Sequence, residues 1–261
     1  MISIIVSTNN EIFLKNILEN IHQTIGDIDY EIIDIFNPKK YSLCEAYNIG
    51  VERSKYHYLC FVHDDVVFRT NNWGERLVHL FENDHQIGLI GVVGNKFKSS
   101  YPSAIGQSSF IKKRYMRGSI IQTSTGYRDF DNSQTKKELE DVVCIDGVFM
   151  FTNKNVMNYC AFDDKLLTHF HGYDMDFSLQ VFTKGLRVIV DREMLIEHIS
   201  DGNYSKENTV ANRLIGKKWR KELPVATNDL KLSAFRLHYF DLINWIYFFR
   251  KAMVRKLKNI K

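Results

Sequence analysis

Short apolar runs alternate with stretches of helical periodicity along most of the chain. Residues 2–6 and 58–62 are apolar almost throughout, which predicts strands that are buried on both faces of a sheet. Between them, residues 11–25 carry apolar side chains at helical spacing, and Gly26 ends the pattern. The same criteria predict further strands at 30–36, 88–93, 142–151, 186–190 and 194–198, and further helices at 43–54, 73–83 and 176–184.

Strands that alternate with helices are typical of a mostly parallel sheet with helices on both faces, so the expected fold class is α/β. Sheets of this kind bind ligands at the carboxyl ends of their strands. Polar residues follow three of the predicted strands, at 7–10, at Asn37 and at 63–65. We therefore expect these three groups to lie along one edge of the sheet, although they are distant in sequence.

Two segments depart from this alternation. Residues 95–141 are polar and weakly periodic, which is typical of a functional loop that folds over a ligand. From about residue 232 the chain is basic, aromatic and helical in pattern. Its longest uncharged run, 242–249, is far shorter than the roughly 20 residues of a membrane-spanning helix, so no span is expected. We divide the chain into a domain at 1–205 and a helical C-terminal extension at 206–261.

Charge is distributed unevenly along the chain. The 261 residues have a formal net charge of +4, but residues 231–261 contain eight Lys and Arg against one Asp, a net of +7, which leaves −3 for residues 1–230. A mildly acidic body argues against nucleic-acid binding, whereas the basic end favours an anionic surface. Two uses of the C-terminal helices stay open, peripheral contact with a membrane and packing on the domain or on a second copy in a homodimer.

The cysteines give no sign of a metal or disulfide framework. None of the four pairs in a CxxC spacing, and Cys60 and Cys144 lie inside apolar runs, so we expect reduced thiols. Residues 1–6 enter a strand pattern directly, with no basic segment before it, and we expect no signal peptide. These features predict a cytoplasmic protein, with the inner face of the membrane as one location for its basic end.

The strand at 58–62 ends in His63, Asp64 and Asp65. Adjacent carboxylates at the ligand edge of a sheet are suited to Mg²⁺ or Mn²⁺ bound to a diphosphate, because these ions favour a few carboxylates together with phosphate oxygens. A polar turn with solvated acids is the alternative interpretation of such a pair.

Three other positions carry candidate chemistry. Asp174 and Asp176 stand at an expected helix start, where one can cap the helix while the other faces the cleft as a general base, or both can be caps. His198 ends a late strand, and a neutral imidazole is a good Mn²⁺ ligand, although a lone histidine is more often structural. Asp146 and Gly147 interrupt a strand, which indicates either a bulge or the close approach of a ligand.

Several common nucleotide-binding and hydrolytic motifs are absent from the sequence. It contains no GxGxxG, GxxxxGK[ST], GxSxG or HExxH pattern. Their absence argues against four classes of enzyme: dehydrogenases, P-loop enzymes, hydrolases with a nucleophile elbow, and zincins.

Taken in order, the remaining motifs resemble the family 2 glycosyltransferases with the GT-A fold, and among these the StrF-like branch. The family's ARN-x-G and FLDxDD stretches are similar to residues 46–50 and 58–65. Its FDE, GEDxDxxxR, G and H stretches are similar to residues 162–163, 172–177, Gly185 and His198. The resemblance covers about residues 1–200 and implies a Rossmann-like, mostly parallel sheet flanked by helices, followed by the helical extension.

The resemblance implies an inverting, metal-dependent hexosyltransferase that uses a nucleotide-diphosphate-sugar donor. The acceptor would be a hydroxyl of a saccharide or of a lipid-linked saccharide, in surface polysaccharide or glycoconjugate synthesis. Asp174 would be the general base, and Asp65 and His198 would hold Mn²⁺ or Mg²⁺. We assign donor binding to Thr8, Asn9, Asn37, Asn48, Asp64, Asp65 and Gly147. Secondary candidates for the site are His63, Asp146 and Asp176.

The sequence departs from this family pattern at three places. His63 replaces the first acid of the DxD motif, Phe36 stands where an Asp usually holds the base, and Tyr173 and Gln180 replace the Glu and Arg of the last stretch. Two alternatives therefore stay open. One is a non-catalytic module that binds a saccharide or a partner on the same scaffold. The other is a sugar nucleotidyltransferase, although residues 7–10 lack the glycine-rich, lysine-bearing loop of that class.

Overall fold

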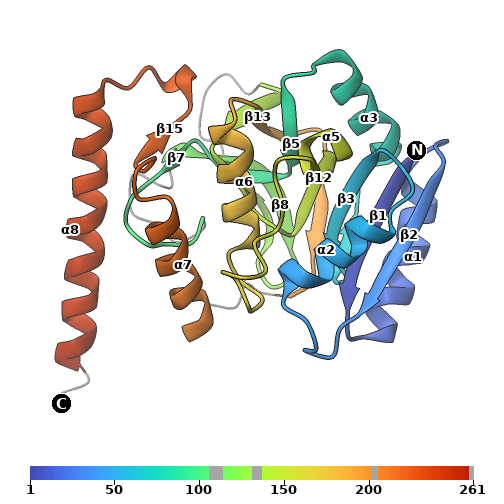
Figure 1. Cartoon of the computed structure of the whole chain (residues 1–261), viewed down its shortest axis with the longest axis horizontal. Coiled ribbons are helices and arrows are strands. Elements are labelled where there is room, and N and C mark those ends of the chain that lie inside the picture. Colours follow the sequence, from blue (N-terminus) through green and yellow to red (C-terminus); the bar gives the residue numbers. More distant parts are fainter. Residues whose placement is uncertain (106–113, 131–136, 201–204, 259–261) are drawn as a thin grey trace.

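A seven-stranded sheet forms the centre of the protein (Figure 1). The computed structural model describes residues 1–105, 114–130, 137–200 and 205–258. The strands of this sheet are β1 (Ile2–Thr8), β2 (Tyr30–Phe36), β3 (Tyr58–His63), β5 (Ile87–Gly91), β10 (Leu139–Val142), β12 (Phe149–Asn153) and β13 (Arg187–Asp191). Their order across the sheet is β10-β13-β5-β12-β3-β1-β2.

The sheet is mostly parallel, as the alternating pattern predicts. β1 pairs in parallel with β2 and β3, and β13 pairs in parallel with β5. β12 lies antiparallel between β3 and β5, and β10 is antiparallel to β13 at the edge. Five strands therefore present their carboxyl ends at one edge, and the antiparallel β12 brings the preceding turn, with Asp146 and Gly147, to that same edge.

Helices cover both faces of this sheet, which explains the continuous apolar runs of its strands. On β1, Ile4 and Val6 pack in the same core cluster as Ile17 of α1 (Glu11–Thr24). Ile5 points to the other face, into a cluster with Tyr47 of α2 (Leu43–Arg53). The first face is also covered by α3 (Trp73–Asn83), and the second by α6 (Tyr173–Thr183) and the short α5 (Lys154–Met157).

A second sheet lies beside the first and supplies part of the site. Its strands are β4 (Val66–Phe68), β6 (Val93–Asn95), β8 (Met116–Gln122), β9 (Gly126–Asp129), β11 (Cys144–Ile145) and β14 (Ile196–His198). The order is β11-β6-β8-β14-β4, and β9 pairs with β8. A further pair joins β7 (Phe97–Lys98) to β15 (Val225–Ala226).

The expectation of a long loop without regular structure at 95–141 is wrong. β7, β8, β9 and most of β10 fall within it, while residues 106–113 and 131–136 lie outside the described part of the chain. Its strands are short, and polar residues such as Arg117 and Ser119 interrupt their apolar pattern. β8 pairs with the adjacent β9 as a hairpin and with β6 and β14, which lie farther away in the sequence. Such distant partners leave no periodic signal in the segment itself.

The C-terminal part is largely helical, with α7 (Lys206–Lys218), the 3₁₀ turn η1 (Asn228–Leu230) and α8 (Ala234–Lys258). Figure 1 shows α8 at the opposite end of the molecule from α1 and β2. In the described part of the chain, no helix combines the length and the apolar composition that crossing a membrane requires. The division at residue 205 stays a prediction, and α7 buries Ala211 and Ile215 in the same core cluster as α6.

α6 begins without a side-chain cap, so the expectation that Asp174 or Asp176 caps this helix is wrong. The N-cap residue is Gly172, whose φ of 90° is strained for any other residue. A Cβ at Gly172 would also lie 2.8 Å from the Cδ1 atom of Ile215 in α7. Close packing between α6 and α7 therefore sets this helix start, and both acids fall inside the first turn.

Asp176 joins α6 to the end of α7. Its carboxylate is buried, with a side-chain exposure of 1%, and accepts hydrogen bonds from the indole Nε1 of Trp219 at 2.7 Å and from Nζ of Lys218 at 2.8 Å. The amide of Gln180 donates a third bond at 2.9 Å. An acid with these partners has a structural task in holding α7 against the domain.

We expect Asp176→Ala to lower the free energy of unfolding by about 2–4 kcal/mol, because it leaves the Lys218 ammonium and the Trp219 indole without their buried acceptor. Asp163→Ala is the matched control, since Asp163 binds the same lysine but is 29% exposed, and it should cost about 1 kcal/mol or less. Urea unfolding followed by circular dichroism measures both. Equal losses in the two variants would contradict the structural role of Asp176.

Candidate active site

Three strand ends meet at the carboxyl edge of the central sheet, as the alternating pattern predicts. The hydroxyl of Thr8, at the end of β1, donates to Oδ2 of Asp64 at 2.5 Å. The backbone N–H of Asn37, after β2, donates to the carbonyl of Thr8 at 2.7 Å. Asn9 follows Thr8 and is exposed. These side chains, predicted to bind the donor, therefore share one edge, and their roles stay predictions.

The side chains of Asn37 and Asn48, both predicted to bind the donor, make hydrogen bonds within the local structure. The side chain of Asn37 exchanges hydrogen bonds with the backbone of Tyr41, at 2.9 and 3.1 Å, and so closes the loop after β2. Asn48, in α2, donates to the carbonyl of Phe162 at 2.9 Å and to Asp164 at 3.0 Å. Both side chains position loops around the edge of the sheet.

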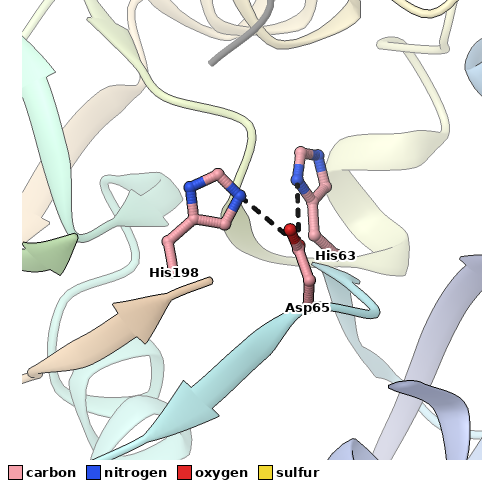
Figure 2. A group of neighbouring side chains, drawn as sticks. All are labelled: His63, Asp65 and His198. Atoms are coloured by element: carbon pink, nitrogen blue, oxygen red, sulfur yellow. Dashed lines mark ion pairs between the residues drawn. The ribbon is translucent and has the colours of Figure 1, made fainter. Parts of the chain in front are cut away.

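His63, Asp65 and His198 come together at the junction of the two sheets (Figure 2). One ligand atom from each lies within 4.8 Å of the others. Nε2 of His198 is 3.4 Å from Oδ1 of Asp65, and Nδ1 of His63 is 3.9 Å from the same oxygen. The antiparallel pairing of β4 with β14, which sets His198 opposite Val66, brings the late histidine to the turn that carries Asp65.

The charges in this cluster are those of a cation site. Burial lowers the pKa of His63 to about 4, so its imidazole is neutral at pH 7 and has a lone pair to offer. Burial alone would raise the pKa of Asp65, but hydrogen bonds to His198 and to the backbone of Ser200 hold it well below its usual value. The cluster thus presents an ionised carboxylate together with a neutral imidazole.

Tyr173, at the start of α6, determines which nitrogen of His63 faces Asp65 as an acceptor. The Tyr173 hydroxyl donates its single proton to the carbonyl of Gly147 at 3.0 Å. The same oxygen lies 2.7 Å from Nε2 of His63, so it must accept a proton from that nitrogen. A neutral imidazole protonated at Nε2 carries its lone pair on Nδ1, the atom that points to Asp65 (Figure 2).

This donor set fits a divalent transition ion. Metal–ligand bonds of about 2.0–2.2 Å place neighbouring ligand atoms about 3 Å apart, so the 3.4 and 3.9 Å separations need only a small closure. Two imidazole nitrogens with one carboxylate suit Mn²⁺ better than Mg²⁺, which favours oxygen ligands. Three protein ligands leave the other coordination positions for water or phosphate oxygens.

A cavity of about 800 Å³ opens beside the cluster. Of the predicted site residues, its walls include His63, Asp146, Gly147, Asp174 and His198. Thr8, Asn9, Asn37, Asn48, Asp64, Asp65 and Asp176 are not among the lining residues. The candidates therefore separate into a group at the cavity, a group at the neighbouring edge of the sheet, and Asp176 beneath α7.

Among the acids that line this cavity, Asp174 has a strongly raised pKa. Burial and the nearby charge of Asp146 together raise its pKa to about 7, against the opposing effect of backbone hydrogen bonds. One of these bonds comes from the N–H of Gly147, 3.1 Å from Oδ2. A carboxylate whose pKa lies near neutrality can take up a proton from a hydroxyl and release it again.

Gly147 joins Asp174 to Tyr173 through its backbone. Its N–H binds Asp174, and its carbonyl accepts the Tyr173 proton. A Cβ at this position would lie 2.2 Å from the Tyr173 hydroxyl oxygen. The close approach that the glycine suggests is therefore made by Tyr173, and only glycine leaves room for the ring.

Sequence reasoning missed several cavity residues. Tyr173 was noted only as a departure from a motif. Gln122, in the segment interpreted as a loop, lies 3.4 Å from Nδ1 of His198 through its amide nitrogen. Asn208 and Asn212 line the cavity from α7, which was assigned to the extension. Their spacing with Ala211 along one helical face was the available signal.

Comparisons with known proteins bear on the family and the fold. The sequence matches the model of the Glycosyltransferase like family over residues 3–213. No curated protein matches it. Among solved structures, GalNAc-T7 crystallised with UDP, GalNAc and Mn²⁺ superposes with a TM-score of 0.59 at 12% identity, covering 85% of this chain and 49% of that one. This likeness shows that the chain has the GT-A fold, and the chain spans about half the length of that protein.

Two further structures resemble the chain less closely. TarS from S. aureus has a TM-score of 0.47 at 11% identity and covers 76% of this chain and 36% of its own. A197 from STIV has a TM-score of 0.41 at 13% identity, with coverages of 77% and 86%.

We expect Tyr173→Phe to weaken Mn²⁺ binding about tenfold or more, because the His63 ring loses the acceptor that holds its Nε2 proton. Isothermal titration calorimetry measures the affinity directly. Tyr47→Phe is the matched control, since the buried Tyr47 hydroxyl has no hydrogen-bond partner within the described part of the chain and its ring lies 5.5 Å from that of Tyr173. Unchanged Mn²⁺ affinity in Tyr173→Phe would show that Tyr173 does not support the metal site.

Proposed function

Since the chain belongs to the glycosyltransferase-like family 2, we propose that it is an inverting, metal-dependent enzyme that moves a hexosyl group from a nucleotide-diphosphate-sugar to a hydroxyl. The acceptor in this proposal is a saccharide or a lipid-linked saccharide, and the product belongs to a surface polysaccharide or glycoconjugate. The StrF-like branch within the family stays a prediction.

The observation that carries the proposal is the position of Asp174 in the cavity that His63 and His198 of the metal cluster also line. Both are attached to the turn at Gly147, which binds Asp174 through its N–H and, through Tyr173, fixes the His63 ring. A base on one side of a reacting carbon and a cation-held leaving group on the other are what an inverting displacement requires. The cavity of about 800 Å³ is large enough for sugar units of donor and acceptor.

In the proposed step, the acceptor oxygen attacks the anomeric carbon of the donor sugar. The new carbon–oxygen bond forms as the bond to the diphosphate oxygen breaks, and the bonding electron pair leaves with the nucleoside diphosphate. Asp174 takes the proton of the acceptor hydroxyl. Attack opposite the leaving group inverts the anomeric carbon, and no covalent sugar–protein intermediate forms.

The charge that develops on the leaving diphosphate needs a partner. When bound, a divalent cation supplies Lewis-acid stabilisation of that charge. His63, Asp65 and His198 are the residues that would hold it, and their nitrogen-rich donor set leads us to propose Mn²⁺ as the preferred ion. The Mn²⁺ and UDP named with GalNAc-T7 support a nucleotide donor and this ion as parts of the proposal.

The nucleoside end of the donor is proposed to lie along the edge formed by Thr8, Asn9 and Asp64. These residues adjoin the cluster through the His63–Asp65 turn and lie outside the cavity, so a donor placed there would lead its sugar into the cavity. Asp64 is joined to Thr8, which leaves Asp65 as the carboxylate that faces the two histidines. The four cysteines are free and buried, which supports a cytoplasmic location.

Release of nucleoside diphosphate tests the reaction class. With a panel of nucleotide sugars and Mn²⁺, we expect turnover that EDTA abolishes and that Mn²⁺ restores better than Mg²⁺. A non-catalytic module would give no metal-dependent release, and a nucleotidyltransferase would release pyrophosphate from a nucleoside triphosphate instead. Either result would overturn the proposal.

Asp174→Asn should reduce transfer by at least about 100-fold, because the amide cannot accept the hydroxyl proton. Donor binding should persist, since the amide oxygen can still accept the N–H of Gly147. Chromatographic product analysis measures transfer, and thermal shift with the donor measures binding. Substantial residual transfer by a variant that binds the donor normally would exclude Asp174 as the base.

The pH dependence gives an independent test. The base acts when ionised, so kcat/KM should rise with pH through about 7, the raised pKa of Asp174. In Asp146→Asn the neighbouring negative charge is gone, and the acidic limb should move to lower pH. The wild-type and variant profiles are measured at saturating Mn²⁺. An unmoved limb in a folded, active Asp146→Asn variant would contradict this electrostatic coupling.

A further inference from the structure

α8 carries two apolar faces on opposite sides. One packs on the rest of the protein: Phe248 stacks on Tyr101 with ring centroids 4.5 Å apart, and Asn244 is fully buried. Leu237, Phe240 and Ile243 join a cluster with Phe97 and Tyr115. The helix is therefore attached from Leu237 to Phe248, and the exposed residues from Phe249 to Val254 extend beyond this contact.

Polar contacts fix this attachment. The carboxylate of Asp241 is buried and accepts hydrogen bonds from the backbone N–H of Ser100 at 2.8 Å and from the Ser99 hydroxyl at 2.5 Å. The indole of Trp245 donates to the hydroxyl of Ser100 at 2.8 Å. These bonds determine which side of α8 faces inward, and so also which side faces out.

The outward side presents a continuous apolar stripe. Its members are spaced alternately by four and three residues and are between 49% and 79% exposed: Phe235, Tyr239, Leu242, Ile246, Phe249 and Met253. At 100° per residue they fall within an arc of about 80°, and they extend about 27 Å along the helix. An exposed stripe of this kind on an otherwise attached helix marks a surface that binds something.

The stripe could bind either a second copy of α8 or a lipid surface, and the charges beside it distinguish the two. The spacing would suit a second copy of α8, but the positions beside the stripe include Arg236 and Arg250 and no acid. The only acidic residue of α8, Asp241, is buried against Ser99 and Ser100. Two such helices would bring like charges together without compensation.

An anionic lipid surface matches both features. Residues 231–261 have a net charge of +7, and the exposed Arg236 and Arg250 lie beside the stripe. Amphipathic helices that lie in a bilayer interface combine an apolar face of aromatic and aliphatic residues with flanking basic residues. We propose that the outward stripe of α8 docks this protein on the surface of an anionic membrane, a property independent of the proposed reaction.

Vesicle sedimentation of the full chain tests this docking. Vesicles of phosphatidylcholine with phosphatidylglycerol, in a ratio of roughly 7:3, should bind the protein, and pure phosphatidylcholine vesicles should bind it at least about tenfold less. Raising the salt to about 0.5 M should weaken the binding to anionic vesicles. Equal binding to both kinds of vesicle, or binding to neither, overturns the proposal.

Variants assign the binding to the stripe. The triple variant Leu242→Ser, Ile246→Ser, Phe249→Ser should bind anionic vesicles at least about tenfold less than the wild type. The matched control replaces three exposed apolar residues elsewhere, Ile12, Tyr159 and Val210, by Ser and should bind as the wild type does. Circular dichroism and thermal unfolding check the fold of each variant.

A second pair of measurements keeps the test decisive if the triple variant is unstable. Arg236→Glu with Arg250→Glu changes only exposed charges beside the stripe and should also lose binding to anionic vesicles. Sedimentation velocity without vesicles reports the second-copy alternative. A dimer that the stripe substitutions dissociate, in a protein that does not bind vesicles, would overturn membrane docking.

Discussion

The hydroxyl of Tyr173 has one proton to donate, and the candidate site depends on where that proton goes. The hydroxyl donates this proton to the carbonyl of Gly147, so its oxygen accepts a proton from Nε2 of His63. The lone pair of His63 is then on Nδ1, which points to Asp65. The next residue along the chain is Asp174, held by the N–H of the same glycine. One tyrosine and one glycine thus fix the proposed metal ligand His63 and the proposed base Asp174 relative to each other.

Much of the central sheet was predictable, because its strands are buried on both faces and leave continuous apolar runs. The predicted strand at 30–36 and helix at 73–83 have the bounds that the structure shows for β2 and α3. The shared edge of Thr8, Asn37 and Asp64 followed from the rule that parallel strands end together. Family resemblance then predicted roles for Asp65, Asp174 and His198, which periodicity alone could not separate from ordinary turn and cap residues.

The rest could not be predicted, for physical reasons that differ from place to place. β8 pairs on one side with β14, which is distant in sequence, so Gln122 was hidden in an apparent loop. α7 contributes Asn208 and Asn212 to the cavity wall because the buried hydrogen bonds of Asp176 hold α7 beside α6. No local sequence pattern predicts these hydrogen bonds. The state of His63 depends on a hydroxyl more than a hundred residues away.

The raised pKa of Asp174 also bears on what happens after each transfer. A base that has taken a proton must lose it before it can act again. A carboxylate with a pKa near 4 would release the proton easily but would accept it weakly, whereas one near 9 would stay protonated in neutral water. With a pKa of about 7, Asp174 is balanced between the two demands, so in the proposed role it could return its proton to solvent after each transfer.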